Sequence, residues 1–145
     1  MMASLLSARE VRERLDLRPH PEGGSFREVY RETASGGGRG ALSSILYLLA
    51  AGEVSAWHRI RDAAEIWLFH AGAPLELSLA PADGSPATTV MGTDLATGEQ
   101  PQIAIPAGVW QSARSRGAWS LVGCVVAPAF EYAGFELAPP QFSPW

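Results

Sequence analysis

Three polar side chains in otherwise apolar stretches are the best candidates for chemistry in this sequence: His58, Glu65 and Gln111. An imidazole changes its charge near neutral pH, so His58 can exchange a proton with a ligand. Glu65 can orient that imidazole, and the amide of Gln111 can both donate and accept hydrogen bonds. If the fold brings these three together, they predict a binding site for a small molecule or an acid–base site.

The same three side chains would make a poor metal site. The amide oxygen of Gln111 is a weak ligand for a first-row transition metal beside an imidazole, and a stable site needs at least three good donors. We therefore expect no tightly bound metal and no other cofactor. One alternative stays open, in which His58, Glu65, Gln111 and water form a reduced metal site in an oxygenase-like enzyme.

Length and composition narrow the class of protein. The chain has 145 residues, a net charge of −4 and 47% hydrophobic residues, which suits one domain with a full core. The negative charge argues against nucleic acid or an anionic membrane as a partner. No apolar run approaches the roughly 20 residues of a membrane helix, and the N-terminus becomes charged too early for a signal peptide. We expect a cytoplasmic protein.

Two kinds of element must position the candidate residues. Ser7 and Glu10 have the spacing of a capping box, which predicts a short helix over about residues 8–15. Short apolar segments then alternate with Gly- and Pro-rich turns, as is typical of a β-sandwich or barrel. A glycine-rich mobile loop is expected at residues 34–40. The expected strands are 25–32, 42–50, 53–60, 64–71, 75–80, 88–91, 102–105, 111–114, 120–126 and 136–137.

The spacing of Gly52, His58, Glu65 and Gly72, followed by Pro106-Ala107-Gly108, resembles the two motifs of the cupin superfamily. Longer blocks, among them LRPHPEGGSFRE at residues 17–28 and PAGVWQ at 106–111, resemble the DUF985 (cupin type 5) family over about residues 15–138. The resemblance implies an all-β double-stranded β-helix, or jelly-roll, barrel. It also implies one cupin domain over residues 1–145, with the barrel at about 20–138, a pocket at the barrel mouth and a homodimer.

The sequence departs from the cupin motifs at the metal-ligand positions. Ile60 and Gln111 stand where the motifs have histidines, and Ser115 stands where the second has asparagine. Of the family's metal ligands, the resemblance therefore carries over only His58 and Glu65.

Strand alternation predicts which side chains share the pocket. If Glu65 points into the barrel, Trp67 and Phe69 do so too, and if His58 points inward, so do Ala56 and Ile60. We expect His58 to be half-exposed at the barrel mouth. The predicted ligand-binding residues are His58, Glu65, Trp67, Phe69 and Gln111, with Glu22 and Arg27 as charges on the rim.

Besides the reduced metal site of an oxygenase-like enzyme, two metal-free functions remain open. The first is metal-free binding of a small polar or carbohydrate-like molecule. The second is a metal-independent isomerase, epimerase or lyase, in which His58 is the general base, Glu65 orients it, and Tyr47 or Tyr30 is the acid. A nucleotide-sugar substrate would need cations for its diphosphate, and the predicted pocket offers few.

Overall fold

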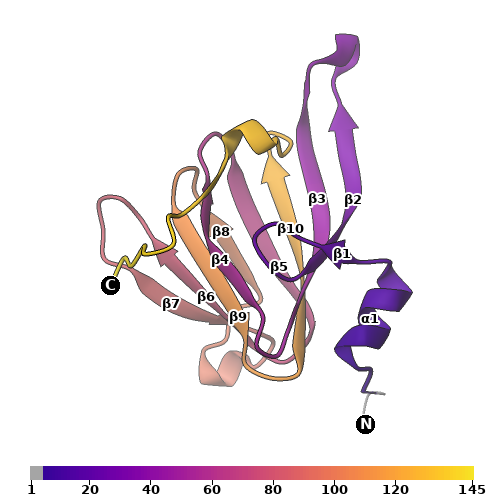
Figure 1. The fold of residues 1–145 in the computed structure, drawn as a ribbon, viewed down its shortest axis with the longest axis vertical. Helices are drawn as coiled ribbons and strands as arrows, with labels where there is room; N and C mark the ends of the chain where they lie inside the picture. The colour runs from indigo at the N-terminus through magenta and orange to yellow at the C-terminus, as the bar shows by residue number, and fades with distance from the viewer. Residues whose placement is uncertain (1–4) are drawn as a thin grey trace.

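The computed structural model describes residues 5–145, so residues 1–4 of the predicted domain lie outside the described residues. Two antiparallel sheets face each other, and a helix lies beside one of them (Figure 1). The first sheet has the order β1-β2-β3-β10-β5-β8 and the second has the order β11-β4-β9-β6-β7. This is the predicted all-β cupin architecture with a short N-terminal helix.

The strands are bounded as follows. The first sheet contains β1 (Arg18–Pro19), β2 (Ser25–Thr33), β3 (Arg39–Ala50), β10 (Trp119–Ala127), β5 (Ala64–Gly72) and β8 (Gln102–Ile105). The second contains β11 (Phe135–Leu137), β4 (Val54–Ile60), β9 (Trp110–Ser115), β6 (Leu75–Ala80) and β7 (Ala87–Met91). Single 3₁₀ turns are formed by η1 (Ser35–Gly37), η2 (Leu95–Thr97) and η3 (Tyr132–Gly134).

Every predicted strand is present, and its ends move by three residues at most. Two features differ from the prediction. The loop expected at 34–40 is shorter than predicted, because η1 turns the chain and β3 begins already at Arg39. The two-residue strand β1 was missed because Arg18 and Pro19 have no apolar alternation to reveal them.

Helix α1 (Ala8–Leu15) has the predicted limits. The Ser7 hydroxyl accepts a hydrogen bond from the backbone of Glu10, whose carboxylate accepts one from the backbone of Ser7, so the capping box is complete. At the other end, Arg27 of β2 donates to the carbonyl of Leu15 at 2.7 Å. This contact ties the helix to the edge of the first sheet. No helix among residues 5–145 is long and apolar enough to cross a membrane.

The space between the sheets has two parts, a closed core and a cavity, which follow one another along the strands. Toward one end, inward side chains form a closed core that includes Tyr47, Trp67 and Val122. Toward the other end, the same strands present Ile45, Glu65 and Val126 to a cavity instead. Each of these strands therefore contributes to the core with one part of its inward face and to the cavity with the other.

Candidate functional site

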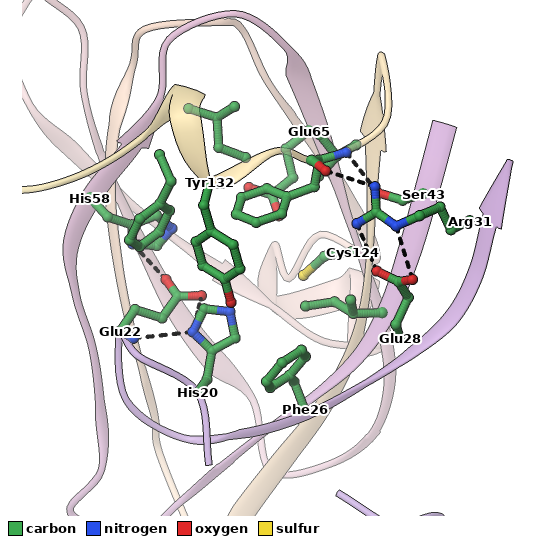
Figure 2. Close-up of a pocket in the computed structure, with 15 residues that line it drawn as sticks. His20, Glu22, Phe26, Glu28, Arg31, Ser43, His58, Glu65, Cys124 and Tyr132 are labelled. Carbon is green, nitrogen blue, oxygen red and sulfur yellow. Dashed lines mark hydrogen bonds and ion pairs between the residues drawn. The ribbon is translucent and has the colours of Figure 1, made fainter. Parts of the chain in front are cut away.

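A cavity of about 200 Å³ lies between the sheets at the end away from the closed core (Figure 2). Its apolar lining residues are Phe26, Ile45, Ile60, Val126, Phe130 and Phe135. Its other lining residues are His20, Glu22, Glu28, Arg31, Ser43, His58, Glu65, Cys124 and Tyr132. The cavity therefore combines a mostly apolar wall with a cluster of ionisable groups.

The closest contact in this cluster joins His58 to Glu22. Nδ1 of His58 lies 2.6 Å from Oε2 of Glu22 and 2.8 Å from the carbonyl oxygen of Ala56. With two acceptors around it, Nδ1 carries a proton. Ser55 donates a further hydrogen bond to Oε2 of Glu22 at 2.8 Å. Because no hydrogen bond to Nε2 of His58 is found among the described residues, that nitrogen remains available to a ligand.

Charge attraction within this pair overcomes the cost of burial. Burial alone would raise the pKa of Glu22, but the charge of His58 and the hydrogen bonds from His58 and Ser55 hold that pKa below its ordinary value. Burial alone would lower the pKa of His58, but the charge and hydrogen bond of Glu22 raise it above its ordinary value. Each member of the pair therefore favours the charged form of the other.

His20 lies on the other side of Glu22 and stays neutral. The backbone N–H of Glu22 donates to Nδ1 of His20 at 3.1 Å, so that nitrogen has no proton and Nε2 carries it. Burial lowers the pKa of His20 below its ordinary value. Its ring packs edge-on against Phe26, with the centroids 4.6 Å apart.

Glu65 faces the cavity from β5, and a chain of two hydrogen bonds through Gln111 fixes its position. Trp67 donates to Oε1 of Gln111 at 3.1 Å, and Nε2 of Gln111 donates to Oε1 of Glu65 at 2.9 Å. Burial raises the pKa of Glu65 to about 7. Glu65 can therefore gain or lose a proton near neutral pH, while Gln111 fixes its position.

The structure changes two of the predictions for His58. Glu22, and not Glu65, is the carboxylate that orients the imidazole. The side chain of His58 is only 3% exposed, so the expectation of a half-exposed residue was wrong. The turn before β2 delivers Glu22 because Gly23 and Gly24 adopt φ values of 108° and 77°, which glycine tolerates best.

Gln111, Trp67 and Phe69 do not line the cavity, contrary to the prediction. Trp67 and Gln111 are each 1% exposed, and Phe69 packs against the closed core. Alternation identified the inward face of β5 correctly. It could not reveal that, on this one face, Glu65 lines the cavity whereas Trp67 belongs to the closed core. Gln111 and Trp67 therefore support the site through Glu65 rather than touch a ligand.

The two predicted tyrosines and the predicted rim arginine also lie elsewhere. The Tyr47 hydroxyl donates to the carbonyl of Gly23, burial raises its pKa, and the side chain is fully buried outside the cavity lining. Tyr30 is 52% exposed on β2, and Arg27 is bound to Leu15. The tyrosine that does line the cavity is Tyr132.

Ser55 was missed because β4 does not alternate regularly. The pairing of β4 with β9 shifts register between Ser55 and His58, so both side chains are buried and Ala56 is exposed. The expectation that Ala56 points inward was therefore wrong. No residue type in this stretch marks the irregularity.

Residues Ala129–Phe135, here called the roof segment, bring Phe130, Tyr132 and Phe135 to the cavity. Three arginines hold its backbone. Nη1 of Arg31 donates to the carbonyl of Phe130 at 2.8 Å, Nε of Arg39 to that of Ala129 at 2.8 Å, and Nη2 of Arg61 to that of Ala133 at 2.7 Å. The aromatic residues that follow Pro128 are the signal in the sequence from which this part of the lining could be predicted.

The family model described as the cupin superfamily (DUF985) matches residues 9–138. The chain belongs to the DUF985 family of the cupin superfamily. A crystal structure of a structural-genomics target from Shewanella oneidensis is 41% identical to this DUF985 cupin, with a TM-score of 0.86 over 92% of this chain and 85% of that one. A hypothetical protein from Leishmania major is 30% identical, with a TM-score of 0.83 over 92% and 88%.

Oxalate decarboxylase from Bacillus subtilis is a more distant neighbour of this DUF985 cupin. It is 17% identical, with a TM-score of 0.64 over 82% of this chain and 29% of that one. At that identity the likeness concerns the fold alone. A search of the curated proteins gives no match.

The residues of this DUF985 cupin do not fit a tightly held metal ion. Among residues 5–145, no group of three His, Cys, Asp or Glu side chains is arranged to hold one. Both ends of the Gln111 amide are engaged by Trp67 and Glu65, and Nδ1 of His58 is engaged by Glu22. The predicted set of His58, Glu65 and Gln111 therefore lacks three available donors.

Proposed function

We propose that this DUF985 cupin binds a small molecule, without a metal, in the cavity between its sheets. The observation that supports this is the gathering of His58, Glu22 and Glu65 around one cavity, although each is 7% exposed or less. Burying ionisable groups costs free energy. Perturbed titratable groups in a largely apolar pocket are characteristic of ligand sites.

The size of the cavity limits the ligand. Pockets for drug-sized ligands occupy roughly 300–1,000 Å³. At about 200 Å³, this cavity suits a smaller metabolite, such as the predicted small polar or carbohydrate-like molecule.

A metal-independent isomerase, epimerase or lyase is the second candidate. It is favoured by the placing of two differently poised groups on one cavity: Glu65, whose pKa is about 7, and His58, whose pKa Glu22 raises. Efficient acid–base groups have pKa values near the working pH. Glu65 would then take a proton from the substrate and His58 would supply one, whereas the sequence predicted His58 as the base, Glu65 as its orienting partner and a tyrosine as the acid.

The binding proposal is tested by a ligand-observed NMR screen of a library of small metabolites. Hits should bind wild-type protein and be lost in Ile45→Phe, because the half-buried Ile45 side chain faces the cavity and a larger ring would fill it. The matched control is Val54→Phe, at a 50% exposed position outside the cavity. A screen without hits, or hits that Ile45→Phe leaves unchanged, would contradict the proposal.

Protein purified without chelators is expected to carry well below one equivalent of Fe, Mn, Ni or Zn, because the cavity offers too few available donors. Elemental analysis by mass spectrometry measures this directly. A stoichiometric metal that is removed by chelation together with ligand binding would contradict the expectation.

We also propose that the protein forms a homodimer through the outer edge of β2. Within residues 5–145, β1 pairs only with Ser25 and Phe26, and the rest of that edge has no neighbouring strand. Val29 and Tyr30 are each 52% exposed there, and open sheet edges favour pairing with a second chain. Light scattering should give twice the chain mass of 15.4 kDa at micromolar concentration. A monomer alone would refute this.

A further inference from the structure

Two charged residues of the cavity lining, Arg31 and Glu28, already neutralise each other within the protein. Arg31 is the arginine in the described lining, and its three donor nitrogens are all in use. Nε and Nη2 donate to the two carboxylate oxygens of Glu28 at 3.0 and 2.8 Å, and Nη1 donates to the carbonyl of Phe130. These bonds use three of the five N–H groups of Arg31, and an anionic ligand would find the charge of this guanidinium already balanced by Glu28.

Of the buried groups deeper in the cavity, His58 is matched by Glu22 at 2.6 Å, and His20 is neutral because its Nδ1 accepts a backbone N–H. Glu65 has no counter-ion among the described residues, and burial favours its neutral form. An anion would therefore face Glu22 and Glu65 without an unpaired cation to receive it. A cation would have to compete with His58 for Glu22 or hold Glu65 in its ionised form, so burial of either ion in this cavity is unfavourable.

The polar groups still able to bind a ligand are few. Within the described residues, Nε2 of His58 has no hydrogen-bond partner, and Oε1 of Glu65 accepts a hydrogen bond from Gln111. Phe26, Phe130 and Phe135 contribute aromatic rings to the remaining wall. The high pKa of Glu65 agrees with an interior that resists negative charge.

We propose that the ligand of this cavity is an uncharged molecule with an apolar body and one carbonyl or hydroxyl group, whose oxygen lies against His58 and Glu65. The aromatic and aliphatic wall takes the body, and the two polar side chains take the oxygen. Phosphorylated and carboxylated metabolites are excluded. This inference rests on the proposed function, and it replaces the small polar or carbohydrate-like ligand considered there by a mainly apolar one, because the wall is largely apolar.

The test uses three probes that share one ring: cyclohexanone, cyclohexanecarboxylate and cyclohexylammonium. Each is titrated at pH 7 into ¹⁵N-labelled protein, and the amide shifts of Phe26, Glu65 and Phe130 report occupation of the cavity. Cyclohexanone should bind at least tenfold more tightly than either ion.

The second part of the test leaves Arg31 without its counter-ion. Glu28→Gln removes the counter-ion of Arg31, and the 41% exposed Glu28 side chain makes a stable fold expected. Cyclohexanecarboxylate should then bind at least threefold more tightly than it binds wild-type protein. The matched control is Glu13→Gln, which removes the exposed ion pair with Arg9 outside the cavity and should change nothing.

The outcomes separate this inference from the proposed function. Equal or tighter binding of either ion in wild-type protein would overturn the inference and leave small-molecule binding standing. An unchanged carboxylate affinity in Glu28→Gln would refute the charge argument. If all three probes leave the cavity amides unshifted, the inference fails, and if the metabolite screen is empty as well, the proposed function fails with it.

Discussion

Replacing Glu65 by glutamine is expected to raise the free energy of unfolding by about 3 kcal/mol at pH 8 and to change it little at pH 4. The pKa of Glu65 is about 7 in the folded protein, against an ordinary value of 4.5. Between these values the folded state binds more protons than the unfolded state, so stability falls as pH rises. Each pKa unit corresponds to about 1.36 kcal/mol. Glutamine removes this penalty and can still accept the hydrogen bond from Gln111.

Urea unfolding of wild-type protein and Glu65→Gln at pH 4, 6 and 8 measures the effect. Glu13→Gln, on the exposed face of α1, is the control and should show less than about 1 kcal/mol at every pH. If Glu65→Gln were less stable than wild type at pH 8, the buried carboxylate would be stabilised by its surroundings. The acid–base assignment of Glu65 would then be wrong.

Replacing Glu22 by alanine is expected to lower the free energy of unfolding by about 3–5 kcal/mol, because His58 would remain buried without its counter-ion. The pKa of His58 should also fall below its ordinary value of 6.5, since burial would no longer be opposed by the Glu22 charge. Glu22→Gln keeps the shape of the side chain and should shift the pKa of His58 in the same direction with a smaller loss of stability.

The pH dependence of this loss has a definite sign. The stabilisation from Glu22, whose pKa is lowered, is present above the ordinary value of 4.5 and disappears as pH falls through the folded-state pKa. The stabilisation from His58, whose pKa is raised, is present below 6.5 and disappears as pH rises through the folded-state pKa. The difference between wild type and Glu22→Ala should therefore be largest between pH 4.5 and 6.5.

NMR titration of the imidazole resonances in wild-type protein and in both Glu22 variants checks the pKa shift of His58. Ser55→Ala is the matched control, since it removes a neutral hydrogen bond to the same carboxylate oxygen and should cost about 1 kcal/mol. If the pKa of His58 stays high in Glu22→Gln, the main charged partner of His58 is Glu65. The assignment of Glu22 as that partner would then be wrong.

The strands were predictable because their signal is local. Apolar alternation and Gly- or Pro-rich turns identified the strands within three residues, and the capping box at Ser7 and Glu10 located the helix. The inward direction of Glu65 and His58 followed from the resemblance to the cupin motif, and alternation then predicted their neighbours on the same face. These local patterns indicate on which side of the sheet a residue lies.

The pairing of His58 with Glu22 was not predictable, because it depends on how a turn before β2 meets β4. Glu22 was recognised only as a charge on the rim, although it is 7% exposed and bonded to two side chains of β4. Which part of the space between the sheets is core and which is cavity could not be predicted for a similar reason. Trp67 and Glu65 share one face of β5, and only the packing of the opposite sheet decides which of them meets a ligand.

The anchoring of the roof segment has a consequence for how ligand preference can diverge. Arg31, Arg39 and Arg61 all bind backbone carbonyls, which every amino acid possesses. The side chains at Phe130 and Tyr132 are therefore free to be exchanged without loss of the hydrogen bonds that keep the segment in place. Selection, or an engineer, can vary these two positions to change what the cavity accepts, while the sheets that carry His58 and Glu65 stay untouched.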